Sequence, residues 1–133
     1  MPNLELKVTL VDGSLNVDQS GNANQMGRGK SGIIIWKLTG NASSGTFNAM
    51  DASNPGFAWK QGTPSGVFGQ PILASQGKHI ELSDTNTDPN GVTSSGEWVY
   101  QLFATVGGVT YSTMATSGRV TIETITDPTI KNN

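Results

Sequence analysis

Oxygen-bearing side chains alternate along one polar segment and have the chemistry of a calcium site. Asp84, Asn86 and Asp88 stand two residues apart, and Asn90 and Gly91 follow. Calcium takes about six to eight oxygen ligands, which carboxylates and side-chain amides supply. In the helix-flanked calcium loop a Gly comes directly after the third ligand, whereas two residues intervene here. The segment therefore predicts a calcium site at Asp84, Asn86 and Asp88, or alternatively an ordinary turn, because Asp-Pro-Asn-Gly is a common turn sequence.

A tryptophan between two segments rich in Gly and Pro is the best candidate for contact with a ligand. Trp59 lies beside Phe57, and Asn54 opens the Asn-Pro-Gly turn that precedes them. Aromatic faces pack against the C–H surfaces of sugar rings. Trp36 and Trp98 lie instead within strongly apolar segments, where we expect burial in a core. We therefore predict a ligand-binding site at Trp59, Phe57 and Asn54, with a glycan as the candidate ligand.

The residues of the common catalytic sites are missing or scattered. The chain has no cysteine and one histidine, His79, so a zinc site of Cys and His ligands is excluded. Residues 27–31 (Gly-Arg-Gly-Lys-Ser) are similar to a phosphate-binding loop, but Asn24 replaces its first Gly and a β-branched run replaces its helix. The 10 acidic residues lie singly and single out no pair for glycoside hydrolysis. The sequence favours a protein that is not an enzyme.

Net charge and charge content bear on the class of partner. The formal charge is −2, and only 14% of the residues are charged. A nucleic-acid-binding protein carries a basic patch that neutralises phosphates, and two cations, Arg28 and Lys30, are too few for one. We therefore predict no nucleic-acid partner, and no cofactor other than the calcium considered above.

The sequence also bears on the compartment. The chain has no cysteine and so no disulfide, and it begins without the basic and apolar regions of a signal peptide. Its longest apolar run, at residues 33–36, is far shorter than the roughly 20 residues of a membrane-spanning helix. We expect no membrane span, and a protein that is cytoplasmic or is exported without a cleaved signal peptide.

Short alternating segments separated by turns must position these residues. No stretch of helical spacing is long enough for a helix, and Gly- and Pro-containing turns recur along the chain. Residues 32–38 are apolar on both faces, which predicts a central strand. The pattern predicts a single domain, residues 1–133, that folds as an antiparallel β-sandwich, immunoglobulin-like or jelly-roll-like, of about seven to nine short strands. The expected strands cover residues 4–10, 14–18, 32–38, 47–50, 57–60, 79–82, 97–104, 109–113 and 120–125.

Three segments of the chain resemble a group of small uncharacterised bacterial β-sandwich proteins. They are residues 32–36, residues 96–100 and the closing Asp-Pro-x-Ile-x-Asn motif at residues 127–132. A more distant similarity is to the bacterial inclusion-body protein family, which also places a Trp on a mid-chain strand and an Asp-Pro pair near its end. The resemblance implies a bacterial β-sandwich and brings no catalytic residue to any position of this chain.

These observations favour a non-catalytic bacterial β-sandwich that acts by self-assembly, as a homo-oligomer, or by binding a protein partner. Low charge, faces rich in Thr and Ser, and an exposed edge strand would allow pairing at the edge of a sheet. The alternative is a carbohydrate-binding, lectin-like module that uses Trp59, with or without calcium at Asp84 and its neighbours.

Overall fold

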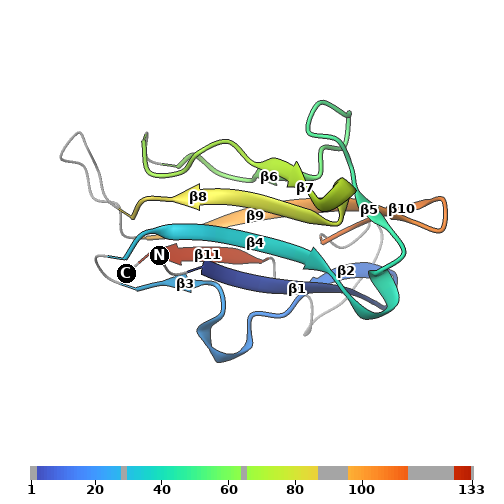
Figure 1. Cartoon of the computed structure of the whole chain (residues 1–133), viewed down its shortest axis with the longest axis horizontal. Coiled ribbons are helices and arrows are strands. Elements are labelled where there is room, and N and C mark those ends of the chain that lie inside the picture. The colour runs from blue at the N-terminus through green and yellow to red at the C-terminus, as the bar shows by residue number, and fades with distance from the viewer. Residues whose placement is uncertain (1–2, 28–29, 64–65, 87–95, 114–127, 133) are drawn as a thin grey trace.

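The computed structural model describes residues 3–27, 30–63, 66–86, 96–113 and 128–132, which form two β-sheets packed face to face (Figure 1). Short 3-10 helices, η1 (Ser20–Asn22), η2 (Gly40–Ala42) and η3 (Ser75–Gly77), connect some of the strands. No helix within the described residues is long and apolar enough to cross a membrane. The strands are β1 (Asn3–Val11), β2 (Ser14–Val17), β3 (Gln25–Met26), β4 (Gly32–Leu38), β5 (Thr46–Phe47), β6 (Phe57–Trp59), β7 (Ile72–Ala74), β8 (His79–Asp84), β9 (Gly96–Val106), β10 (Val109–Ser112) and β11 (Thr129–Asn132).

The first sheet has the strand order β2-β1-β4-β8-β7. Its central strand, β4, runs parallel to β1 and antiparallel to β8. Burial alternates along β4, because Ile34 and Trp36 face the second sheet whereas Ile33 and Ile35 face outward and are only half-buried. The prediction of a central strand is confirmed.

The second sheet is built around β9, in the order β10-β9-β11-β3, and β5 and β6 also pair with β9. Even-numbered residues of β9 bond to β10 and β11, since Leu102 accepts a hydrogen bond from Thr113 N–H and Tyr100 N–H donates to Pro128. The odd-numbered Val99 accepts instead from Lys60, directly after β6. One long strand therefore organises both halves of this sheet.

The all-β sandwich expected from the sequence is confirmed. The sheets are mixed rather than purely antiparallel, because β1 pairs in parallel with β4 and β3 in parallel with β11. Strands β3, β7 and β11, which have two, three and four residues, were not expected. The strand expected at residues 120–125 lies outside the described residues.

The core lies between the two sheets, and a hydrogen bond spans it at its centre. Trp36 Nε1 of β4 donates to Tyr100 Oη of β9 at 2.7 Å, and both side chains are fully buried. Burial also raises the pKa of the Tyr100 hydroxyl well above its usual range, so the group stays neutral. The apolar side chains around this pair include Leu6, Val8, Leu15, Met26, Ile34, Leu38, Ile80, Leu82, Leu102, Ala104 and Ile130.

We predict that Tyr100→Phe lowers the free energy of unfolding by about 1–3 kcal/mol, because the variant leaves the buried Trp36 N–H without its acceptor. Denaturant titration of the purified protein measures the change. Tyr111→Phe, at a half-buried ring on β10, is the matched control and should cost less than about 0.5 kcal/mol. Equal losses in the two variants would contradict a special role for the bond.

Candidate functional site

The three residues predicted to bind a ligand have different environments. Trp59 is half-buried at the end of β6, and Asn54 is exposed in the preceding loop, where its C=O accepts a hydrogen bond from Asn48 Nδ2 at 3.0 Å. Phe57 is only 4% exposed, because its ring stacks on Tyr100 in the core. Phe57 is thus a supporting residue with no open face for a ligand, and Trp59 is the residue of this set that keeps an accessible aromatic surface.

Neighbouring rings hold the Trp59 side chain in place. Its ring meets Phe57 edge-on at a centroid distance of 5.0 Å, and Phe68 packs against it at 4.8 Å. Phe68 in turn contacts Trp98 of β9 at 5.4 Å. Such edge-on and tilted contacts are the favoured arrangements of aromatic pairs. A row of rings therefore runs from the buried Trp36 to Trp98, and the burial expected for Trp36 and Trp98 is confirmed.

Sequence reasoning missed the part of Phe68 in this row. Phe68 lies outside the named strands and joins the first sheet only through an isolated bridge to Asp84. The residues around Phe68 are rich in Gly and Pro and predict irregular backbone. They show no alternation of apolar and polar residues, so the sequence does not indicate where the Phe68 side chain points. The aromatic residues that recur along the sequence were the available signal, but their positions do not show which rings are in contact.

The candidate calcium ligand Asp84 lies at the end of β8 and is only 1% exposed. Its Oδ1 accepts a hydrogen bond from Asn86 N–H at 2.9 Å and another from Asn132 Nδ2 of β11 at 3.1 Å. Within the described ranges, Oδ2 has no hydrogen-bond partner. Asn86 is buried too, and its Nδ2 donates to the Gly27 C=O at 2.8 Å. The structure thus brings Asp84 and Asn86 together, and it adds Asn132, which the sequence did not suggest.

A negative charge on Asp84 costs free energy, because desolvation disfavours the ionised form of the carboxyl group. Burial raises the pKa of Asp84 to about 6, against the opposing effect of the hydrogen bonds from Asn132 and Asn86. The described part of the chain contains no group of three or more acidic or His side chains placed to hold a metal ion. Asp88 lies outside the described residues, so calcium binding by this loop stays a prediction.

The aromatic row and the buried acid meet at one end of the sandwich, the end where Figure 1 marks both termini. Phe68 is bridged to Asp84, and Asn132 pairs with Gly96 at the start of β9. A Cβ at Gly96 would lie 2.9 Å from the Trp98 ring, and φ there is +151°, so the ring takes space that only Gly leaves open. The two candidate sites are therefore structural neighbours.

A different surface feature lies at the free edge of the first sheet. Ile72 and Leu73, adjacent residues of β7, are 54% and 37% exposed. The other large apolar side chains exposed in the described ranges, Val11 and Val109, are 49% and 51% exposed and lie on other strands. Strand β7 ends the sheet, whereas β2, at its other edge, lies against β9 and β10 of the second sheet. The β7 edge is thus the place where two exposed apolar residues are adjacent.

The backbone of β8 turns its hydrogen-bonding groups alternately to its two neighbours. Lys78 C=O accepts a bond from Leu38 N–H, at the end of β4. Ser83 C=O accepts from Gly69 N–H, on the side of β7. In an antiparallel ladder this alternation continues along the strand, so residues 79, 81 and 83 of β8 face β7.

This alternation shows which backbone groups of β7 are directed toward β8. Ile72 is paired with Glu81 and Ala74 with His79, so these two residues of β7 direct their backbone groups toward β8. Leu73 lies between them, and its N–H and C=O therefore point away from the sheet. Sequence reasoning expected an exposed edge strand but did not locate it, because it assigned the segment around Ile72 to irregular backbone.

No protein-family model matches this chain, and no curated protein matches it in sequence. The resemblance to small bacterial β-sandwich proteins and to the inclusion-body protein family therefore stays a prediction.

We predict that the contribution of Asp84 to stability falls as the pH rises. The pKa of Asp84 is about 6 in the folded protein, against the ordinary aspartate value of 3.8, so the folded state binds the proton more tightly between these values. The stabilisation is complete below the lower value and is lost as the pH rises through the folded pKa. Relative to the Asp84→Asn variant, the free energy of unfolding of the protein should fall by on the order of 2–3 kcal/mol between pH 4 and pH 7.

Denaturant titrations of both proteins at the two pH values measure this difference, and the comparison cancels the titration of all other groups. A difference between the proteins that is the same at both pH values would contradict the raised pKa.

Proposed function

We propose that this chain is a non-catalytic bacterial β-sandwich that acts by self-association, and that β7 provides the contact. The observation that carries the proposal is the exposed pair Ile72 and Leu73 on an edge strand, with the Leu73 backbone groups directed outward. Unpaired N–H and C=O groups of an edge strand are a template for another strand. An apolar side chain on such an edge adds a surface that gains free energy when it is covered.

The magnitudes indicate a weak, concentration-dependent complex. Full burial of an Ile or Leu contributes roughly 1.5–3 kcal/mol, and these two are only partly exposed, so the pair from two molecules supplies roughly 3–5 kcal/mol. Association costs an estimated 4–15 kcal/mol in translational and rotational freedom. Backbone hydrogen bonds and the rest of the sheet must supply the remainder. We expect association at high protein concentration, and the same edge can accept a strand of another protein.

For the compartment we propose the cytoplasm, or export without a cleaved signal peptide, because the chain has no cysteine with which to form disulfides. The small number of basic residues supports a role that does not involve nucleic acid.

We predict that Ile72→Lys shifts the protein toward the monomer, because it places a charge on the apolar edge. Size-exclusion chromatography with light scattering, across a wide range of protein concentrations, measures the mass. Val11→Lys is the matched control, since Val11 is exposed to a similar extent on β1, and it should behave as the unmodified protein. A monomer at every concentration of the unmodified protein would refute self-association, and equal dissociation in both variants would move the contact away from β7.

A glycan-binding function is the second candidate, and the half-buried Trp59 favours it. The rings of Phe57 and Phe68 fix its orientation, so little conformational entropy is lost when a sugar stacks on it. Calcium at the neighbouring Asp84 would add oxygen coordination at the same end of the sandwich.

We predict, for this second function, a glycan-array signal that Trp59→Ala abolishes and Trp59→Phe largely retains. Phe keeps an aromatic face and the packing on the neighbouring rings, so it controls for damage to the fold. The arrays are compared with and without calcium. Unchanged binding in Trp59→Ala would exclude that residue from any glycan site.

A further inference from the structure

We infer that the partner of β7 is a second copy of this chain, paired antiparallel across a twofold axis that passes beside Leu73. The inference rests on the proposed self-association and adds the partner, the direction and the register. A twofold contact requires a surface that is complementary to itself. The β7 edge meets this requirement in its backbone, in its side chains and in its charges.

In the inferred pair the backbone contact is made by Leu73, the residue of β7 whose N–H and C=O face away from the sheet. In a hydrogen-bonded antiparallel pair, two opposite residues exchange both N–H···O=C bonds. Leu73 and the partner's Leu73 form such a pair about the axis, because each presents N–H and C=O away from its own sheet. Leu73 is also the middle residue of β7, so the axis lies at the centre of the strand.

The residues on either side of β7 exclude the other registers. A shift by two residues would place Leu73 opposite Pro71, which has no N–H, or opposite Ser75, which opens η3 with φ of +51°. A shift by one residue would set Leu73 against a residue whose backbone groups are already bonded to β8. Only the Leu73-centred register keeps both central hydrogen bonds.

The side chains are complementary in size in the same register. Ile72 then lies opposite the partner's Ala74, and Ala74 lies opposite the partner's Ile72. Both pairs are on the outer face of the sheet, where Ile72 is more than half exposed and has room beside the small Ala. A large residue facing a small one allows close strand pairing without a clash. On the other face, Leu73 approaches the partner's Leu73.

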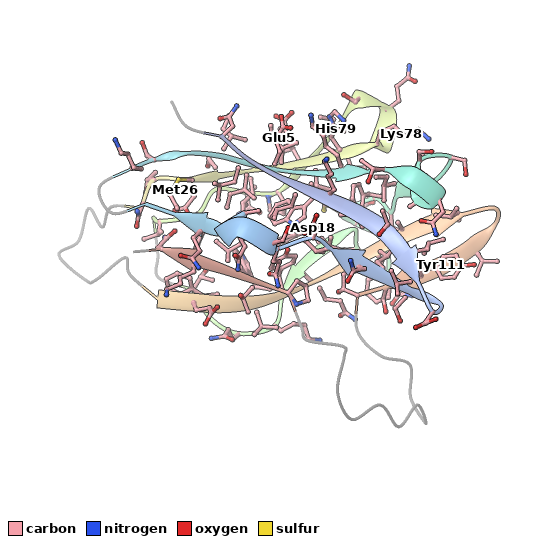
Figure 2. All side chains as sticks on the ribbon, turned by 90° about the horizontal axis from the view of Figure 1, so that it is seen from below. Glu5, Asp18, Met26, Lys78, His79 and Tyr111 are labelled. Carbon is pink, nitrogen blue, oxygen red and sulfur yellow. The ribbon has the colours of Figure 1, made fainter. Side chains whose placement is uncertain are left out.

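The outer face of the first sheet carries its charges in rows that run across the strands. One row is acidic, with Glu5 and Glu81 on either side of Ile35, and it ends at Ile72. Figure 2 shows Glu5 and His79 projecting from the same side of the molecule, away from the second sheet. The adjacent row is basic and runs through Lys7, Lys37 and His79 to Ala74.

Antiparallel pairing at Leu73 joins the acidic row of each copy to the basic row of the other, because Ile72 meets the partner's Ala74. Glu81 and the partner's His79 are three strand spacings apart, about 14 Å, which exceeds the screening length of about 8 Å at physiological salt. The charge pattern is therefore complementary in the antiparallel pair, but it adds little to the strength of pairing. Within one copy the rows are already linked, since Lys37 Nζ lies 3.1 Å from Glu5 Oε2.

Single cysteine variants test this register, because the chain has no cysteine of its own. In the inferred pair the two Leu73 Cα atoms lie about 5.5 Å apart, within the range of about 4.4–6.8 Å that a disulfide spans. Leu73→Cys should form a covalent dimer under mild oxidation, seen on a non-reducing gel. Val109→Cys, at a residue that is at least as exposed, is the matched control. We expect cross-linking at least about tenfold faster for Leu73→Cys, because pairing holds the thiols at millimolar effective concentration.

A mixed experiment tests the register without changing Leu73. Ile72→Cys and Ala74→Cys, mixed in equal amounts, should form the mixed disulfide faster than either variant cross-links alone. Light scattering on the unmodified protein separates the two levels of the proposal. A dimer whose Leu73→Cys variant cross-links no faster than Val109→Cys would overturn the register and leave self-association in place. A monomer at all concentrations, with no preferred cross-linking, would overturn both.

Discussion

The hydrogen bond between Trp36 and Tyr100 is the contact on which the arrangement of the two sheets depends. Trp36 lies in β4, the central strand of the first sheet, and Tyr100 lies in β9, which pairs with four strands of the second. A buried indole N–H needs an acceptor, and the Tyr100 hydroxyl of the facing sheet supplies it at 2.7 Å. Apolar packing draws the sheets together, and this polar pair fixes their relative position.

The end of the sandwich near Asp84 combines two kinds of stabilisation. Aromatic rings fill the space from Trp36 outward to Trp98, while Asp84 and Asn132 place polar groups where no water reaches them. The bond between Asp84 and Asn132 connects β8 of the first sheet to β11 of the second. A buried carboxyl weakens the folded state when it ionises, yet its hydrogen bonds specify which strands meet.

Apolar and alternating patterns in the sequence located the long strands, because β1, β4 and β9 each bury one face against the core. They failed for β3, β7 and β11, which obtain their conformation from neighbours rather than from their own residues. The partner of Asp84 was beyond local reasoning, since Asn132 is 48 positions away. Composition and turn residues thus predict the class of fold, and the sites depend on contacts between distant segments.

The parallel pairing of β3 with β11 has a consequence for how the chain folds. Asn24, beside β3, donates a hydrogen bond to Thr129, which is 105 positions further along. Strand β11 lies between β3 and β9, so this layer is incomplete until the two distant segments have found each other. Contacts of such sequence separation slow folding, since a large loop must close before any of them forms. During that search β9 is without its β11 neighbour, and an unpaired strand edge of this kind makes a partly folded chain prone to aggregation.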